Sequence, residues 1–292
     1  MKSKIIMIMV TPFLINSSLV YAESKTDQKT IIKEIVTTMT DARSSTVNLL
    51  NLYRDGGAKI CAGTLISKNL ILTAAHCIPE DSDKIAVVGF GINLKESILR
   101  SPPKHPTYKI KEIKPYPSYE FGIEKKLDNS YKDLAIFKFN GELPEGFKIR
   151  QLPKDNFQIS SKDTLELLGY GKTSVKQADD GTLRRSILPA TDILNKIYTE
   201  RSDENGEITR TEIQIPKAIL LNNNHGAACE GDSGGPLFVK NSKNELILIG
   251  VLSQGVELTE NSEKCTGYSI FVDLRQKLDW IQKTMNELNS TQ

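Results

Sequence analysis

The sequence has little net charge, few histidines and no long apolar run beyond its start. Its 38 basic and 36 acidic residues give a net charge of +2, so nothing favours nucleic acid or a charged membrane surface as a partner. There are three histidines, and neither His105 nor His225 has a second histidine or a carboxylate at ligand spacing beside it. No oxygen-rich loop typical of a calcium site stands out. No metal and no cofactor is therefore predicted.

The first residues are the exception to the shortage of apolar runs. Lys2 and Lys4 precede a mostly apolar stretch from Ile5 to Leu19, and Val20-Tyr21-Ala22 offers a cleavage site. This pattern predicts a signal peptide over residues 1–22. A membrane anchor is the alternative, but about fifteen apolar-rich residues interrupted by a proline and an asparagine are short for a bilayer. We therefore expect a secreted or periplasmic protein with no stable membrane span in its mature form.

In an exported protein, the four cysteines can form disulfides, because disulfides form and persist in oxidising compartments. We expect the cysteines to pair, although four cysteines allow three connectivities and the spacing does not choose among them.

Short apolar runs separated by turn residues dominate both halves of the chain, which predicts an all-β fold built from barrels. The hydrophobic content of 39% is enough for a sizeable core, in one large domain or two smaller ones. The predicted strands of the first half are residues 46–52, 61–72, 85–90, 109–113 and 134–139. Residues 115–132 are predicted to form a surface loop, and residues 201–210 a charged loop of the second half.

The end of the chain changes period. From residue 272 to 288, apolar residues recur at steps of three and four, which predicts an amphipathic helix. Packing of its apolar stripe on the protein's own core is favoured over docking to a partner.

One stretch carries candidate chemistry, Gly231-Asp232-Ser233-Gly234-Gly235-Pro236. Glycines on both sides let the backbone fold tightly and approach another group closely. The stretch could be an ordinary turn, since these residues are the usual turn formers. For Ser233 to be a nucleophile, it needs a base within hydrogen-bond reach and N–H groups aimed at the oxyanion that forms.

Two further stretches supply that need. His76 follows a strand-like apolar run within Leu72-Thr73-Ala74-Ala75-His76-Cys77, and it is the candidate base. Asp133 stands at the head of an alternating strand, Asp133-Leu134-Ala135-Ile136-Phe137, and it is the candidate residue that orients the histidine.

The three stretches together, TAAHC, DLA and GDSGGP in that order, resemble the trypsin-like (chymotrypsin-fold) serine proteases, in a secreted bacterial-type member. The resemblance implies two packed six-stranded antiparallel β-barrels and a C-terminal α-helix, with His76 and Asp133 from the first barrel and Ser233 from the second. The expected units are a signal peptide (1–22), a pro-segment (23–34), a first barrel (35–146), a second barrel (147–275) and a helix with its tail (276–292).

The resemblance also implies two disulfides and an oxyanion hole. Cys61 would pair with Cys77, and Cys229 with Cys265. The backbone N–H groups of Gly231 and Ser233 would form the oxyanion hole.

Activation is a further implication. In the family, a new N-terminal amine pairs with the aspartate before the nucleophile, here Asp232, and counting back from Cys61 places the new terminus in 31–36. Neither Ile31 nor Ile35 follows Lys or Arg, so the identity of an activating protease stays open. The alternative for Asp232 is a local turn cap, which would fit an enzyme that needs no maturation.

The residues implied for the substrate pocket are uncharged. Ala227 would form its floor, and Ser253, Gly255 and Gly267 its walls. Such a pocket cannot neutralise a buried cation, so cleavage after uncharged or apolar residues is expected. Gln254 stands where the family usually has an aromatic residue.

The resulting hypothesis is a monomeric secreted serine endopeptidase that hydrolyses protein or peptide substrates through an acyl-enzyme. The main alternative is a catalytically silent binding protein on the same fold. An esterase or lipase would also satisfy Gly-x-Ser-x-Gly, but in that fold the serine precedes the acid and the histidine, whereas here it follows them.

Overall fold

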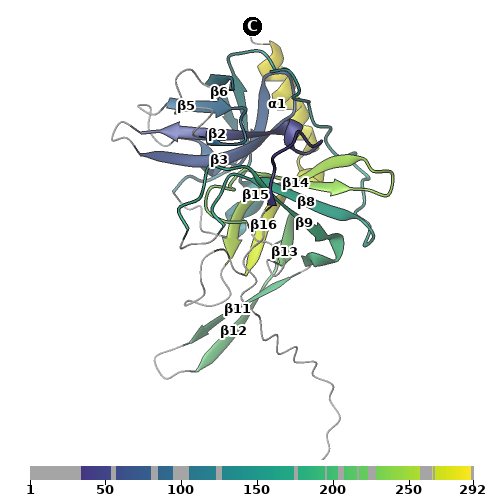
Figure 1. Ribbon diagram of the computed structural model, residues 1–292. Coiled ribbons are helices and arrows are strands. Elements are labelled where there is room, and N and C mark those ends of the chain that lie inside the picture. Colours follow the sequence, from purple (N-terminus) through teal and green to yellow (C-terminus); the bar gives the residue numbers. More distant parts are fainter. Residues whose placement is uncertain are drawn as a thin grey trace, which may run out of the picture.

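The structure is a computed structural model. It describes residues 34–53, 57–79, 85–94, 105–122, 127–173, 177–194, 196–202, 207–215, 217–222, 228–256, 265 and 267–290. The predicted signal peptide and nearly all of the predicted pro-segment lie outside these residues. Figure 1 shows two β-rich halves, one above the other, with the C-terminal helix beside the upper half.

The first half is a closed antiparallel barrel of six strands in the order β2-β3-β4-β7-β6-β5. Its strands are β2 (Thr46–Leu52), β3 (Ala58–Leu65), β4 (Leu70–Thr73), β5 (Ile85–Gly89), β6 (Thr107–Pro115) and β7 (Ala135–Phe139). They lie in the predicted apolar runs, except that the run 61–72, predicted as one strand, is divided by a turn into the end of β3 and most of β4. Inward-facing side chains such as Leu49, Ile71 and Phe137 are completely or almost completely buried and form its core.

The second half is an eight-stranded antiparallel sheet in the order β1-β9-β8-β14-β15-β16-β13-β10. Its strands are β1 (Glu34–Ile35), β8 (Thr164–Gly169), β9 (Arg184–Pro189), β10 (Ile193–Leu194), β13 (Ala218–Asn222), β14 (Pro236–Lys240), β15 (Leu246–Val256) and β16 (Tyr268–Asp273). Two-residue strands at both edges add to the six longer ones. The fold class is confirmed, with a closed barrel in the first half and a curled sheet in the second.

Strand β1 ties the start of the described chain to the second half. Ile35 pairs with Arg184 of β9, and the Val36 amide donates to the Leu183 carbonyl at 3.1 Å. The chain thus pairs with the second sheet before it enters the first barrel, although the sequence assigns residues from 35 onward to that barrel. The other domain boundaries stay predictions.

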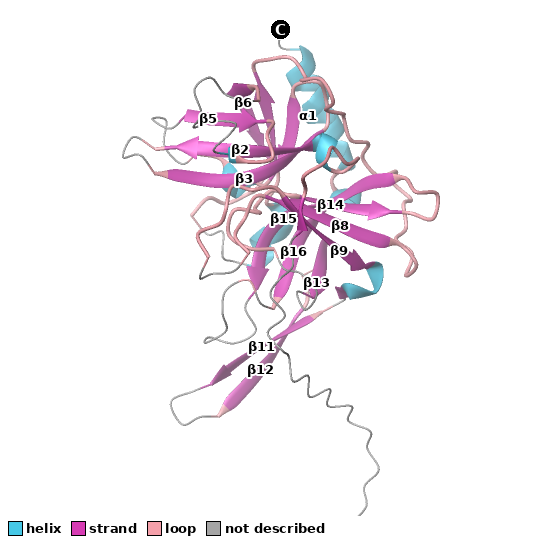
Figure 2. Cartoon of the chain, viewed as in Figure 1, coloured by secondary structure: helices cyan, strands magenta, loops and turns pink. Residues whose placement is uncertain are grey.

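A separate two-stranded ribbon stands where the sequence predicts a charged loop. Strands β11 (Ile197–Ser202) and β12 (Ile208–Ile213) pair only with each other among the described strands, and they project from the second half (Figures 1 and 2). The Tyr198 hydroxyl lies 3.0 Å from Glu212 Oε2, and the Arg210 guanidinium lies 4.2 Å from the Tyr198 ring centroid. Cross-strand pairs of this kind stabilise a ribbon despite its many charges.

The predicted C-terminal helix is present, but it begins later than the apolar period suggests. Residues up to Asp273 belong to β16, and α1 spans Leu278–Ser290. Ile281 and Leu288 pack into the core of the first barrel, which confirms packing on the protein's own core. Across the described residues, no helix is long and apolar enough to cross a membrane.

Candidate active site

His76 lies on η2 (Ala75–Cys77), a single 3-10 turn that follows β4. Ala74 and Ala75 are fully buried, which seats the turn against the barrel, while His76 is only partly buried. The His76 amide donates to Asp133 Oδ1 at 2.9 Å, and its Nδ1 lies 2.7 Å from Asp133 Oδ2. With Nδ1–H facing the carboxylate, Nε2 is the ring nitrogen left to accept a proton.

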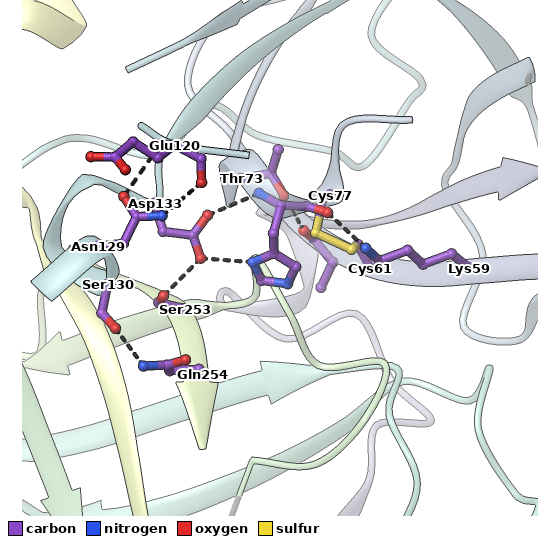
Figure 3. A network of polar contacts seen from close by, with 12 residues as sticks. Lys59, Cys61, Thr73, Cys77, Glu120, Asn129, Ser130, Asp133, Ser253 and Gln254 are labelled. Atoms are coloured by element: carbon purple, nitrogen blue, oxygen red, sulfur yellow. Dashed lines mark hydrogen bonds and ion pairs between the residues drawn. A yellow bond between two sulfur atoms is a disulfide. The ribbon is translucent and has the colours of Figure 1, made fainter. Parts of the chain in front are cut away.

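Asp133 is buried at 3% exposure, between η4 (Leu127–Lys132) and β7. Besides the two contacts with His76, its Oδ2 accepts a hydrogen bond of 2.7 Å from the Ser253 hydroxyl (Figure 3). Three donors therefore hold this carboxylate, which orients the imidazole and is placed to stabilise its protonated form.

Ser233 lies in a turn of the second half whose shape depends on glycine. Gly231 and Gly234 have φ angles of +94° and +76°, which residues with a Cβ rarely adopt. A Cβ on Gly234 would collide with Thr73 Oγ1 and with the Ala62 carbonyl. The Ala62 amide also donates to the Ser233 carbonyl at 2.7 Å. The turn therefore packs directly on β3 and on the end of β4. The last residue of β4, Thr73, precedes His76 by three residues.

The structure brings the three candidate residues to one junction between the halves, but among the described contacts only His76 and Asp133 are bonded to each other directly. Within the part of the chain that it describes, no hydrogen bond joins the Ser233 hydroxyl to His76. Catalysis by the three residues together is accordingly a proposal.

The backbone amides of the Ser233 turn differ in whether they donate hydrogen bonds to carbonyls of the protein. Those of Asp232, Gly234 and Gly235 donate to carbonyls at 2.8–3.0 Å. Among the described residues, the amides of Gly231 and Ser233 donate to no carbonyl. These two N–H groups are the ones expected for an oxyanion hole.

Asp232 is buried at 2% exposure. Its Oδ1 accepts from the Gly171 amide at 2.8 Å and its Oδ2 from the Cys229 amide at 2.7 Å. The second bond is a local cap of the turn, and the first joins the turn to the loop after β8. A cavity of about 10 Å³ lies beside Asp232, and Arg184 also lines it.

Two disulfides flank the site, in the pairing that the resemblance implies. Cys61 of β3 is bonded to Cys77 beside His76, and Cys229 is bonded to Cys265. Cys61, Cys77 and His76 place ligand atoms within 4.8 Å of one another. Because metal-binding cysteines are thiolates, this disulfide-bonded group does not fit a metal.

The predicted substrate pocket is described only in part. Its floor residue, Ala227, lies outside the described residues. Gly255 of β15 pairs with Ser269 of β16, and Gly267 is buried with φ +96° just before that strand. The predicted walls thus lie on neighbouring strands. The hydroxyl of Ser253, predicted as a wall residue, is bonded to Asp133.

Figure 3 shows supporting contacts that the sequence did not predict. The Gln254 amide donates to Ser130 Oγ at 2.6 Å, which links β15 to η4. Asn129 bonds both backbone groups of Glu120, at 2.9 and 3.3 Å. Asn129 and Ser130 are almost completely buried, although the sequence predicts this region as a surface loop. Their nearness to Asp133 in sequence is the one feature that could have indicated them.

Comparisons with known proteins agree with this geometry. The family model described as Trypsin matches residues 35–281. Transmembrane protease serine 11G of Rattus norvegicus is 24% identical over 233 residues, which cover 79% of this chain and 50% of that protein. Ovochymase-2 of Mus musculus is 28% identical over 238 residues, which cover 77% of this chain and 36% of that protein. The chain spans half or less of the length of these curated relatives.

A solved structure of HL collagenase has a TM-score of 0.61 and 21% identity, and covers 88% of this chain and 98% of that one. At this identity the likeness supports the fold alone. The two curated relatives are animal proteins, so the expectation of a bacterial-type member stays a prediction.

Proposed function

Because the chain belongs to the trypsin-like family of serine proteases, we propose that it is a secreted serine endopeptidase with a catalytic triad of Ser233, His76 and Asp133. The observation that carries the proposal is the arrangement around His76. A buried carboxylate holds the ring through Nδ1, and the turn that bears Ser233 packs on Thr73, three residues before the histidine. A base held by an acid, next to a serine, is the arrangement that activates a hydroxyl.

In the proposed reaction, Ser233 Oγ attacks the carbonyl carbon of the scissile peptide bond, and His76 Nε2 takes the hydroxyl proton. The amides of Gly231 and Ser233 donate to the oxyanion of the tetrahedral intermediate. The imidazolium then protonates the leaving amine, which departs and leaves an acyl-enzyme. A water molecule deprotonated by His76 attacks the acyl group, and the proton returns to Ser233.

The proposed specificity is for uncharged or apolar residues before the scissile bond. It rests on the uncharged residue types predicted for the pocket, namely Ala227, Ser253, Gly255 and Gly267. A lysine or arginine side chain buried there would lose its hydration without gaining a carboxylate partner.

Maturation is proposed to expose a new N-terminus within residues 31–36, with Asp232 receiving its amine. The pairing of Ile35 with Arg184 supports this, because Arg184 and Asp232 line the same small cavity. An amine created at Ile35 would thus begin close to the buried carboxylate. Since Glu34 precedes Ile35, an activating protease that cuts there would accept an acidic residue.

The test compares purified mature protein with Ser233→Ala on a mixed peptide library, with N-terminal sequencing and labelling by a covalent serine probe. We expect cleavage after apolar residues, and a loss of about 10⁶-fold in kcat for the variant. Ser67→Ala, in the turn between β3 and β4, is the matched control and should retain full activity and labelling.

Three results would contradict parts of the proposal. Cleavage after Lys or Arg would refute the neutral pocket. Full activity with an N-terminus at Glu23 would refute maturation. Absence of labelling and cleavage after exposure of the new terminus would refute catalysis and favour a binding protein on this fold.

A further inference from the structure

Two side chains bind the turn that carries His76, one from β2 and one from β3, and they lie opposite each other on these paired strands. Asn51 and Lys59 are direct partners in the register of these strands. Lys59 Nζ donates to the His76 carbonyl at 2.8 Å (Figure 3). Asn51 Nδ2 donates to the Cys77 carbonyl at 2.7 Å. One cross-strand pair therefore binds two successive carbonyls of η2.

The carbonyls of this turn divide into two groups. Those of Ala74, just before η2, and Ala75 accept from the backbone amides of Cys77 and Ile78, at 3.2 and 3.0 Å. A single 3-10 turn leaves its last carbonyls without such partners. The last two carbonyls of the turn, those of His76 and Cys77, accept instead from the side chains of Lys59 and Asn51.

The other contacts of the turn leave this position to Lys59. Cys61 lies two residues after Lys59, on the same face of β3, and its disulfide fixes Cys77. Asp133 binds the amide and Nδ1 of His76. Within the described part of the chain, Lys59 alone donates a hydrogen bond to the His76 carbonyl. A charged donor makes a hydrogen bond roughly twice as strong as a neutral one.

We propose that Lys59, together with its cross-strand partner Asn51, is a positioning residue that fixes the His76 peptide and thereby aims the imidazole at Ser233. The inference rests on the proposed peptidase function. Without the Lys59 ammonium, the His76 peptide can rotate between its disulfide anchor and Asp133. A shift of about 1 Å in a reacting group can cost about 10²-fold in rate. Because the other anchors remain, we expect a loss of about 10-fold.

The test measures kcat and KM of Lys59→Met, Lys59→Arg and the control Lys68→Met on one peptide that the wild type cleaves. Lys68 is exposed in the turn between β3 and β4, so its variant makes the same charge change away from the site. We expect kcat to fall about 10-fold in Lys59→Met with KM changed less than about twofold, as for an interaction that acts in the transition state. Lys59→Arg, which keeps a charged donor, should recover most of the loss.

Equal kcat in Lys59→Met and Lys68→Met would overturn the proposal, as would equal losses in the Met and Arg variants or a change confined to KM. Thermal unfolding of all variants identifies any that fail to fold. If Lys59→Met does not fold, Lys59→Gln takes its place, with the same outcomes.

The proton between His76 Nδ1 and Asp133 gives a second readout that needs no turnover. We expect its low-field NMR resonance to be broadened in Lys59→Met and sharp in Lys68→Met and Lys59→Arg. An unchanged resonance in Lys59→Met would count against positioning. Wild-type protein that shows this resonance but no serine-probe labelling would reject the proposed function, while the resonance in the variants would still decide the role of Lys59.

Discussion

The two halves of the molecule hold their candidate catalytic groups by different means. In the first barrel, His76 and Asp133 are held by side-chain contacts that come from several elements, including Lys59 of β3 and Ser253 of β15. In the second half, the position of Ser233 follows from backbone geometry, with positive φ angles at Gly231 and Gly234.

This difference predicts two kinds of failure. A network of side chains can lose one member and keep its shape. Each substitution in the network should therefore lower activity by its own amount while the fold is kept. A turn that needs positive φ and close packing has no partial form, because a Cβ changes the backbone itself. The following experiments test that contrast.

Among the experiments on this contrast, the largest effect is expected for Asp133→Asn, which removes the acid of the side-chain network. An asparagine can hold the imidazole in the wrong tautomer, so kcat should fall about 10⁴-fold while the fold is kept. Asp163→Asn is the control, because Asp163 is also buried and bonds a backbone amide, that of Ser160, away from the site. A loss below about tenfold in Asp133→Asn would remove Asp133 from the proposed triad.

Gly234→Ala should act on stability as well as on activity. A positive φ costs about 1–2 kcal/mol for a residue with a Cβ. Collision with Thr73 and the Ala62 carbonyl adds about 1–3 kcal/mol of overpacking. Gly122→Ala is matched for φ, at +79°, but has nothing within 4 Å of the added Cβ, so only the conformational cost should appear. Equal unfolding free energies for the two variants, measured in urea, would show that the close packing contributes nothing.

Ser253→Ala tests the contact by which the second half supports the acid of the first. It removes one of three donors to Asp133 and keeps the other two. We expect kcat to fall about 10-fold, as for one hydrogen bond to a charged group. Peptide-library specificity should be unchanged if Ser253 acts through Asp133, whereas a changed preference would favour its predicted place in the pocket wall. Ser67→Ala again serves as the control.

The smallest effect is expected where the segment before α1 packs on a loop of the first barrel. Lys277 is buried at 4% exposure, with Nζ 4.1 Å from the Tyr116 ring centroid. Burial, with repulsion from Lys217 and Lys132, lowers the pKa of Lys277 to about 8. In the unfolded chain the pKa of lysine is about 10.4, so between these values the unfolded state binds more protons and stability rises with pH.

This rise should be absent in Lys277→Met. In urea unfolding, the free energy of unfolding of the wild type minus that of the variant should be higher at pH 9.5 than at pH 7.5. If the unfolding free energies of the two proteins changed equally with pH, the lowered pKa of Lys277 would be contradicted.

The reliability of sequence reasoning also differs between parts of this chain. Strands such as Thr46–Leu52 were predicted with their bounds, because apolar runs between turn residues reflect local burial. The ribbon of β11 and β12 was missed, since its cross-strand pairs do not appear in the residue types alone. The pairing of Ile35 with Arg184 was missed for the same reason, as it joins segments far apart in sequence.

The supporting contacts of the site were likewise beyond prediction. Nothing near Lys59 in sequence indicates that its ammonium binds the backbone carbonyl of His76. Ser253 is predicted as a pocket-wall residue by resemblance, and nothing in the sequence indicates that its hydroxyl also binds a carboxylate in the other half. Such contacts depend on side-chain direction and on how two sheets pack, which no short motif encodes.

The sequence by itself determined the fold class, most strands of the first barrel and which residues are candidates for chemistry, because periodicity and the glycines around Ser233 act locally. Tertiary structure alone decided which groups hold those residues in place. The partners of His76 and Asp133 include Lys59 of β3 and Ser253 of β15, and they meet only after a closed barrel and a curled sheet have packed together.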